Sequence, residues 1–181
     1  MKSARAKKSG GAAAVWGQAP FRMVQVNLRN TDASLDPKRL ARQARDFGAD
    51  VLLFNVGGIY AWYPTELPLH EKNPFLKSDI LREIIDACHA IDLKLVGRFD
   101  MSKGTLPAYT AHPDWFIHNR AGEPLIYNGT YQACVNGGWY GGYAHEILRE
   151  ALARYDIDGA FFNMFGYRST NYSGGYHGHC V

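Results

Sequence analysis

The chain has 181 residues, of which 46% are hydrophobic and 20% are charged. These values are typical of a globular protein and exclude a chain that is disordered throughout. The net charge is +3 and comes from the basic first segment, so the remainder lacks the excess of cations that would indicate a nucleic-acid-binding protein.

The sequence also argues against membrane and disulfide-rich classes. No apolar run approaches the roughly 20 residues that a membrane helix needs. Cys88, Cys134 and Cys180 are odd in number and irregularly spaced, which disfavours a disulfide framework. Residues 1–20 are expected to form a disordered leader rich in basic residues and alanine, because Ala12–Val15 is too short for a signal-peptide core of about 7–15 residues. We therefore expect a cytoplasmic protein; association with further copies of the chain stays open.

Four short apolar segments predict β-strands, since β-branched and aromatic residues favour this structure. Each segment ends in an asparagine or aspartate. They are Met23–Asn27, Val51–Asn55, Lys94–Asp100 and Ile157–Asn163.

Apolar residues at three- and four-residue spacing predict a helix between each pair of strands. The first helix is expected to begin after the N-cap Asp36 and to end at Gly48. The second should begin after Ser78 or Asp79 and end near Ile91, and the third should span residues 140–155. Two long loops remain, residues 59–77 and 101–138, and loops of this length are often functional. In the second loop, the segments WFIH and PLIY are expected to pair around the turn NRAGEP.

Strands that alternate with helices predict parallel βαβ units in an α/β fold. Four such units fit either half of a (β/α)8 TIM barrel or a small doubly wound sheet. The first strand is followed by VNLRN rather than a glycine-rich phosphate loop, which disfavours a dinucleotide site. Polar residues at successive strand ends favour the barrel, whose active sites lie at that face. Because a complete barrel takes about 250 residues, residues 21–181 are expected to be a partial barrel, its first four βα units only.

Six segments of the chain, taken in order, resemble the family called hypothetical glycosyl hydrolase 6. They are FRMVQVNLRNTDA, GADVLLFNVGGIYAWYPTELPLH, GRFDMSK, HPDWF, YNGTYQACVNG and DGAFFNMFGY. The resemblance extends from Phe21 to Cys180. It implies a (β/α)8 catalytic domain, related to α-L-fucosidase-like and β-galactosidase-like barrels, that hydrolyses O-glycosyl bonds of a carbohydrate substrate. Members of the family continue through a Cys-rich segment and further barrel units, so this chain is expected to be inactive alone.

Most glycosidases use two carboxyl groups, one as an acid and the other as a base or nucleophile. Asp100 is the best candidate, because it lies where the third strand should open into the active-site face; the alternative is an aspartate that caps its own loop. Arg98 shares the same side of the strand and is expected to hold a carboxylate or a sugar hydroxyl, unless it forms a structural ion pair. The second carboxylate is expected beyond Val181.

Asn163 departs from the pattern of the related barrels. In α-fucosidase-type barrels, the end of the fourth strand supplies an aspartate nucleophile, and an amide cannot form a glycosyl ester. Either another carboxylate acts, or Asn163 only binds substrate, or the protein does not hydrolyse glycosides. Asp158 does not supply the missing group, because it lies at the start of the strand, at the face associated with stability.

Further residues are expected to bind the sugar. Asn27 and Asn55 could donate hydrogen bonds to sugar hydroxyls or brace adjacent loops, and His112 could bind a hydroxyl or have a structural role. The candidate stacking residues are aromatic, and packing within loops is the alternative for each. They are Trp62, Tyr63, Trp115, Tyr127 and Tyr167.

His177, His179 and Cys180 lie within four residues and could begin a zinc site, although a closed site needs four ligands. No other cofactor is expected. Three hypotheses about the function therefore stay open: a glycoside hydrolase, a carbohydrate-binding protein without catalysis, and a metal-dependent hydrolase.

Overall fold

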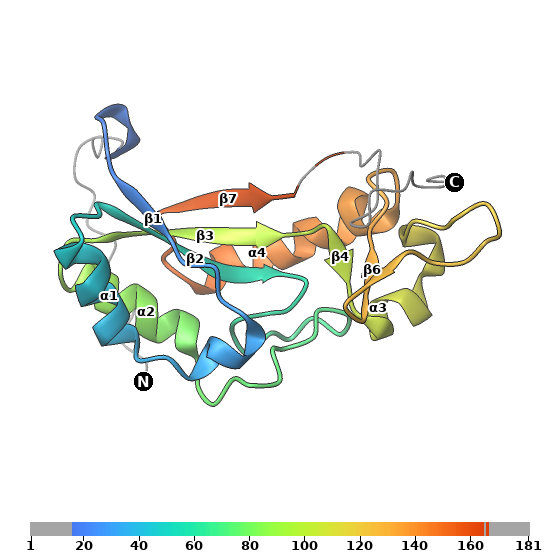
Figure 1. Cartoon of the computed structure of the whole chain (residues 1–181), viewed down its shortest axis with the longest axis horizontal. Coiled ribbons are helices and arrows are strands. Elements are labelled where there is room, and N and C mark those ends of the chain that lie inside the picture. The colour runs from blue at the N-terminus through green and yellow to red at the C-terminus, as the bar shows by residue number, and fades with distance from the viewer. Residues whose placement is uncertain (1–15, 165, 167–181) are drawn as a thin grey trace, which may run out of the picture.

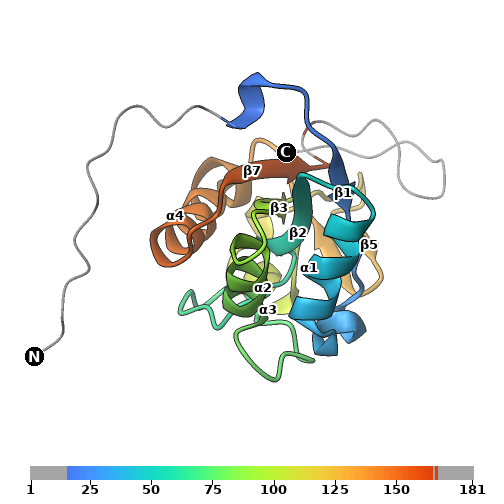
Figure 2. The same ribbon diagram turned by 90° about the vertical axis from the view of Figure 1, so that its left-hand side faces the viewer.

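The computed structural model describes residues 16–164 and 166 (Figure 1). Its main feature is a four-stranded parallel sheet in the order β1-β2-β3-β7. The strands are β1 (Met23–Gln25), β2 (Val51–Gly58), β3 (Lys94–Asp100) and β7 (Gly159–Asn163). The helices between them are α1 (Pro37–Asp46), α2 (Ile80–His89) and α4 (Ala144–Arg154). The predicted α/β alternation with a parallel sheet is confirmed, and Figure 2 shows that all three helices cover the same face of the sheet.

The helices begin and end where the capping residues predict. The Asp36 carboxylate accepts a hydrogen bond from the Arg39 N–H at 3.0 Å at the start of α1, and Gly48 follows its end with φ 94°. Of the two candidate N-caps of α2, Asp79 is the one observed: its carboxylate accepts a hydrogen bond from the Arg82 N–H at 3.2 Å. The third helix opens with a π-helical turn, η4 (Trp139–Tyr143), before α4. Short 3-10 helices are η1 (Trp16–Gln18), η2 (Asn30–Ser34) and η3 (Pro113–Trp115).

The two faces of the sheet differ in chemistry. On β3, Leu95 and Phe99 belong to the buried core that packs against the helices. Side chains of a strand alternate between faces, so Val96, Arg98 and Asp100 lie on the opposite face. Val96 is buried there, and polar groups follow it toward the carboxyl end of the strand. This end of the second face is therefore the place for a polar site.

Strand β2 is longer than the sequence predicted. We expected it to end at Asn55, but its pairing with β3 continues to Gly58. A bulge between Asn55 and Gly57 shifts the register, so that Gly58 lies opposite Asp100. A Cβ on Gly58 would lie 2.1 Å from the Asp100 carbonyl oxygen. The glycine thus permits close approach of two strands rather than a turn, and this part of the prediction was wrong.

The second long loop carries structure that the sequence reading largely missed. A small antiparallel sheet has the order β4-β6-β5. Its strands are β4 (Lys103–Gly104), β5 (Ile126–Tyr127) and β6 (Thr130–Gln132), and the short helix α3 (Leu106–Ala111) lies beside them. The predicted pairing around NRAGEP is confirmed over a short stretch. His118 and Pro124 form an antiparallel bridge, and the Leu125 N–H donates to the Ile117 carbonyl at 2.9 Å. A second hairpin, β5–β6, turns at Asn128 and Gly129, both with positive φ, an Asn-Gly signal typical of tight hairpins.

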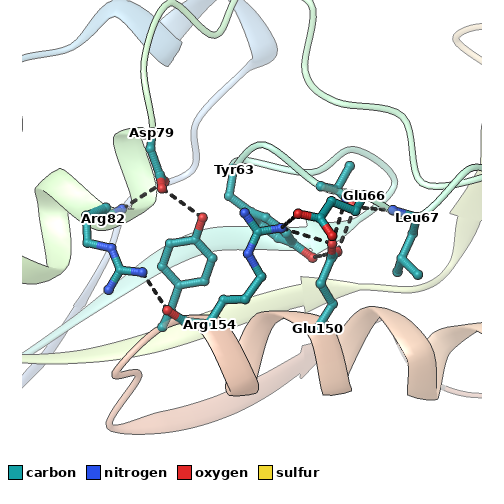
Figure 3. Close-up of polar contacts among 9 residues, drawn as sticks. Tyr63, Glu66, Leu67, Asp79, Arg82, Glu150 and Arg154 are labelled. Carbon is teal, nitrogen blue, oxygen red and sulfur yellow. Dashed lines mark hydrogen bonds and ion pairs between the residues drawn. The ribbon is translucent and has the colours of Figure 1, made fainter. Parts of the chain in front are cut away.

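The first long loop, between β2 and α2, is fastened to α4 by Glu150 (Figure 3). One carboxylate oxygen accepts hydrogen bonds from the Tyr63 hydroxyl at 2.9 Å and the Thr65 hydroxyl at 2.6 Å. The other accepts from the Glu66 N–H at 2.7 Å and from Arg154 at 3.1 Å. Burial opposes ionisation of Glu150, but these donors outweigh it and lower the pKa of the carboxyl group. The loop is therefore held by an ionised side chain that is distant in sequence.

Glu150→Gln is expected to lower the free energy of unfolding by about 2 kcal/mol at neutral pH, because one oxygen that accepts two hydrogen bonds is lost. Urea unfolding measures the change. The matched control is Glu146→Gln, one turn earlier on the same helix, where the ion pair with Arg149 is exposed and its loss should change the stability much less. Equal losses in the two variants would contradict a special role for Glu150.

His70 is buried beneath the end of β2, where the Gly58 N–H donates a hydrogen bond to its Nε2 at 3.2 Å. Burial lowers the pKa of His70 from 6.5 to about 4. Between these two pH values, the unfolded chain binds a proton that the folded chain does not. This contribution to stability is therefore complete above pH 6.5 and declines as the pH falls.

Between pH 6.5 and 4.5 we expect a loss of about 2–3 kcal/mol in the free energy of unfolding. Carboxyl groups titrate mostly below this window, so His70 should dominate it. Urea unfolding across the range measures the slope. His70→Asn keeps a hydrogen-bond acceptor for Gly58 and should flatten the slope; an unchanged slope would assign it to other groups.

Within the described part of the chain, no helix combines the length and apolar character needed to cross a membrane.

Candidate active site

A cavity of about 490 Å³ lies at the carboxyl ends of β1, β2 and β3. Its size falls within the roughly 300–1,000 Å³ of small-molecule sites. The lining is mostly polar and aromatic, and it comes from the ends of the strands, from the loops after them and from the hairpin β5–β6. The lining residues are Asn27, Leu28, Arg29, Asn30, Asn55, Gly57, Ile59, Tyr60, Trp62, Arg98, Asp100, Lys103, Tyr127, Asn128 and Thr130.

Asp100 is the centre of a hydrogen-bond network in this cavity. Its Oδ2 accepts from the Asn163 side-chain amide at 2.8 Å and lies 3.6 Å from Nη2 of Arg98. Its Oδ1 accepts from both the backbone N–H, at 3.1 Å, and the hydroxyl of Ser102. An ionised carboxylate can accept from all these groups, whereas a carboxylic acid would have to donate to one of them. The contacts with Ser102 are those of a loop-capping aspartate, so Asp100 combines capping with exposure to the cavity.

Arg98 connects Asp100 to the neighbouring strand. Its Nη1 donates to Oδ1 of Asn55 at 3.2 Å, and the Asn55 amide donates to the Leu28 carbonyl at 3.2 Å. Asn55 therefore braces the loop after β1 while it lines the cavity. The Nε of Arg98 is buried and has no hydrogen-bond partner in the part of the chain that the structure describes.

Lys103 lines the cavity and was not predicted from the sequence to be a site residue. Strand β4 places it three residues after Asp100, and only 6% of its surface is exposed. Its Nζ donates to the Ser102 hydroxyl at 3.3 Å and lies 5.7 Å from the centre of the Tyr127 ring. One feature of the sequence could have indicated this residue: in the segment MSKGT, a lysine follows closely after the aspartate that ends the strand. The burial of that lysine, however, depends on the hairpin that covers it.

The structure gathers six of the sequence-predicted site residues around the cavity. They are Asn27, Asn55, Trp62, Arg98, Asp100 and Tyr127. Trp62 is buried and packs edge-on against Phe54 with a centroid distance of 5.8 Å, so it forms a wall. Tyr127 is 39% exposed and lines the cavity.

The remaining predicted residues lie elsewhere or outside the described residues. Asn163 contacts Asp100 without lining the cavity. His112 and Trp115 stack on each other with ring centroids 3.8 Å apart, away from the cavity lining. Tyr167 and the candidate zinc ligands are not among the described residues. The latter are His177, His179 and Cys180. Across residues 16–164 and 166, no three His, Cys, Asp or Glu side chains gather as metal ligands would.

Asp158 lies just before β7, at the amino end of the strand, as its sequence position predicted. Its carboxylate contacts His89 at 2.8 Å and Lys94 at 3.1 Å and accepts from the Leu95 N–H at 2.9 Å. Burial raises the pKa of this group, but these contacts outweigh the effect and leave it below the usual value. Asp158 thus joins α2, β3 and β7 at the end of the sheet opposite to the cavity.

Comparison with solved structures shows that the fold is shared with glycosidase domains. The α-L-fucosidase isoenzyme 2 of Paenibacillus thiaminolyticus superposes with a TM-score of 0.66 at 19% identity, over 83% of this chain and 24% of the fucosidase. A hypothetical protein from Ruminiclostridium thermocellum superposes with a TM-score of 0.61 at 12% identity, over 81% of this chain and 78% of that protein. A maltogenic α-amylase from Thermotoga neapolitana superposes with a TM-score of 0.58 at 10% identity, over 81% of this chain and 39% of the amylase. The chain thus spans about a quarter of the fucosidase.

No curated protein sequence matches the chain. The model of one protein family, described as hypothetical glycosyl hydrolase 6, matches residues 36–164. This match extends over α1, the strands β2, β3 and β7, and most of the cavity lining. Since it covers more than half of the sequence, the chain belongs to the hypothetical glycosyl hydrolase 6 family.

Proposed function

We propose that the chain forms the substrate-binding face of a glycoside hydrolase that cleaves O-glycosyl bonds of a carbohydrate. One observation carries this proposal: a hydrogen-bonded Asp100 carboxylate lines a polar, aromatic-walled cavity at the carboxyl ends of parallel strands. Active sites of α/β barrels lie at that end of the sheet. Membership of the family supports hydrolysis of a glycosidic bond as the reaction class.

We further propose that the parallel strands and their helices are the first four βα units of a (β/α)8 barrel. All three helices cover one face of the sheet (Figure 2), and the parallel strands follow their chain order. A barrel has its helices outside and its site within, whereas a doubly wound sheet carries helices on both faces. The fucosidase and amylase similarities support the same architecture.

In this proposal Asp100 acts as an ionised carboxylate, either as base or nucleophile or by accepting a hydrogen bond from a sugar hydroxyl. The groups around Asp100 fit this role better than that of a general acid, because they donate to both of its oxygens and an added proton would face one of these donors. Arg98 and Asn55 orient the sugar, and Asn163 positions Asp100. A second carboxylate is needed for the usual mechanism. Asp100 is the one carboxylate in the described cavity lining, so we place the second outside this set of residues.

The test is turnover of a panel of aryl glycosides by the protein expressed from its intact gene, followed by release of the coloured phenol. We expect saturable hydrolysis of at least one glycoside. Failure of all of them, together with failure of the corresponding methyl glycosides to bind, would refute the proposal.

A carbohydrate-binding protein without catalysis is the second candidate function. The observation that favours it is Asn163, an amide that contacts Asp100 at the strand end where α-fucosidase-type barrels supply a nucleophile. Glycan binding measured by calorimetry, with no turnover on any member of the panel, would establish this alternative in place of hydrolysis.

A further inference from the structure

We propose that the cavity selects a sugar that carries a negative charge, and that Lys103 and Arg98 recognise its anionic group. The anionic group would be either the carboxylate of a uronic acid or a sulfate ester on the sugar, which share a negative charge on oxygen atoms. This inference rests on the proposed function, since it names the substrate class of the same site.

The first argument is the charge of the lining. Three cationic residues, Arg29, Arg98 and Lys103, line the cavity together with one carboxylate, that of Asp100. Arg29 also forms an ion pair with Asp32, which lies outside the lining, at 3.0 Å. With Asp32 counted, three cations face two carboxylates. The 17 acidic residues of the sequence all fall between Asp32 and Asp158, within the described part of the chain. The count of carboxylates in the lining is therefore complete for this sequence. The other polar lining residues are amides and hydroxyls, so the wall has a surplus of positive charge.

The second argument is the position of Lys103. Burying an ammonium group is unfavourable unless polar or charged groups compensate it. The Ser102 hydroxyl and the face of the Tyr127 ring hold the Nζ of Lys103 at the cavity wall. An anionic ligand group at this wall would form an ion pair in a partly dehydrated site, where charge-assisted hydrogen bonds are stronger than neutral ones. The neutral hydroxyl of an ordinary sugar would gain less from the same position.

The third argument is the donor capacity of Arg98. Its contact with Asp100 is 3.6 Å long, beyond ordinary hydrogen-bond length. The Nη2 group is therefore not held in a short hydrogen bond with Asp100, and Arg98 lines the cavity. Planar anions such as carboxylates suit the geometry of a guanidinium group.

The fourth argument is that a stacking surface adjoins these cations. Tyr127 lies at the end of β5, is partly exposed, and lines the same cavity as Lys103. Aromatic rings present an apolar surface with a polar tip, which suits the apolar face of a sugar ring. The β5–β6 hairpin therefore supplies a stacking surface, and the neighbouring strand β4 supplies the charge.

Isothermal titration calorimetry on the wild-type protein tests the proposal without any substitution. The probes are methyl glucuronide and methyl galacturonide, their neutral counterparts methyl glucoside and methyl galactoside, and methyl galactoside 6-sulfate. We expect an anionic probe to bind about tenfold more tightly than its neutral counterpart, with the difference reduced at high salt because screening weakens exposed ion pairs. The uronide and sulfate arms identify which anionic group is preferred.

Variants locate the effect. Lys103→Met removes the charge while retaining an apolar side chain, and it should reduce the preference for the anionic probe to less than about threefold. Lys103→Arg should keep the preference. Lys77→Met, an exposed lysine outside the cavity lining, removes the same net charge and should leave the preference unchanged. Thermal melting checks that each variant is folded.

The outcomes separate this inference from the proposed function. Equal or tighter binding of the neutral probes by the wild-type protein would overturn the inference and leave glycoside binding established. An anionic preference that persists in folded Lys103→Met would remove Lys103 from the proposal. If no probe binds and no aryl glycoside is hydrolysed, the inference and the proposed function both fall.

Discussion

Gly58→Ala is expected to lower the free energy of unfolding by about 3 kcal/mol or more, which makes it the most destabilising single-methyl change that we anticipate. Two effects combine at this position. The added Cβ would lie 2.1 Å from the carbonyl oxygen of Asp100, which is backbone and cannot move aside without separating β2 from β3. In addition, the φ of 109° is one that residues with a side chain rarely adopt. Urea unfolding provides the measurement.

Gly122→Ala is the matched control for backbone conformation. Gly122 also has positive φ, 81°, but no atom lies within 4 Å of a Cβ built there. Its substitution should cost only the conformational penalty, about 1 kcal/mol. Similar losses in the two variants would show that the contact with Asp100 is unimportant. Because Gly58 pairs with the residue at the centre of the candidate site, any folded Gly58→Ala protein should also have altered ligand binding.

Asp100→Asn is expected to reduce kcat of the proposed hydrolysis by roughly 10²–10⁴-fold, the range associated with loss of an acid–base group. The amide has nearly the same shape but no charge. It also places an NH₂ group against Ser102 or Asn163, both of which donate to the carboxylate. Steady-state kinetics on the best aryl glycoside gives the measurement, and kcat should fall more than KM rises.

Asp158→Asn is the control for this experiment. It removes a carboxylate with a comparable set of contacts, but at the amino end of the sheet. Stability should fall, whereas kcat of the folded protein should stay within about twofold, because general acid–base catalysis requires a group within reach of the reacting atoms. Unchanged turnover in Asp100→Asn would remove Asp100 from the mechanism and leave it as a loop-capping residue.

Much of the fold followed from local sequence patterns. The apolar runs that predicted strands and the caps at Asp36 and Asp79 depend on neighbours in the chain, and the structure confirms them. The placing of Arg98 and Asp100 on one face of β3 follows from strand alternation alone. Local patterns therefore sufficed to place Arg98 and Asp100 at the carboxyl end of β3, beside the cavity.

The features that were not predicted depend on contacts between segments that are distant in the sequence. A pair of glycines is typical of a turn, and only the approach of β3 explains why Gly58 continues a strand. Lys103 is polar and would be expected at the surface, but the hairpin around Asn128 covers it. Glu150 fastens a loop more than 80 residues earlier in the chain, and no periodicity encodes such a pairing. The Asn-Gly turn at residues 128–129 is different, because its signal was present in the sequence and was overlooked.

The bulge in β2 has a consequence for comparing this chain with its relatives. Up to Asn55, the strand pairs with β3 in one register, and from Gly57 onward it pairs in a register shifted by one residue. A one-residue slip moves every later side chain to the other face of a sheet. A relative of equal length that lacks the bulge would align across this point without a gap, yet its residues aligned with Gly57 and Gly58 would have exchanged their orientations toward the cavity and the core. Alignments across residue 56 should therefore be anchored on the strand pairing, because sequence identity there does not guarantee the same wall of the site.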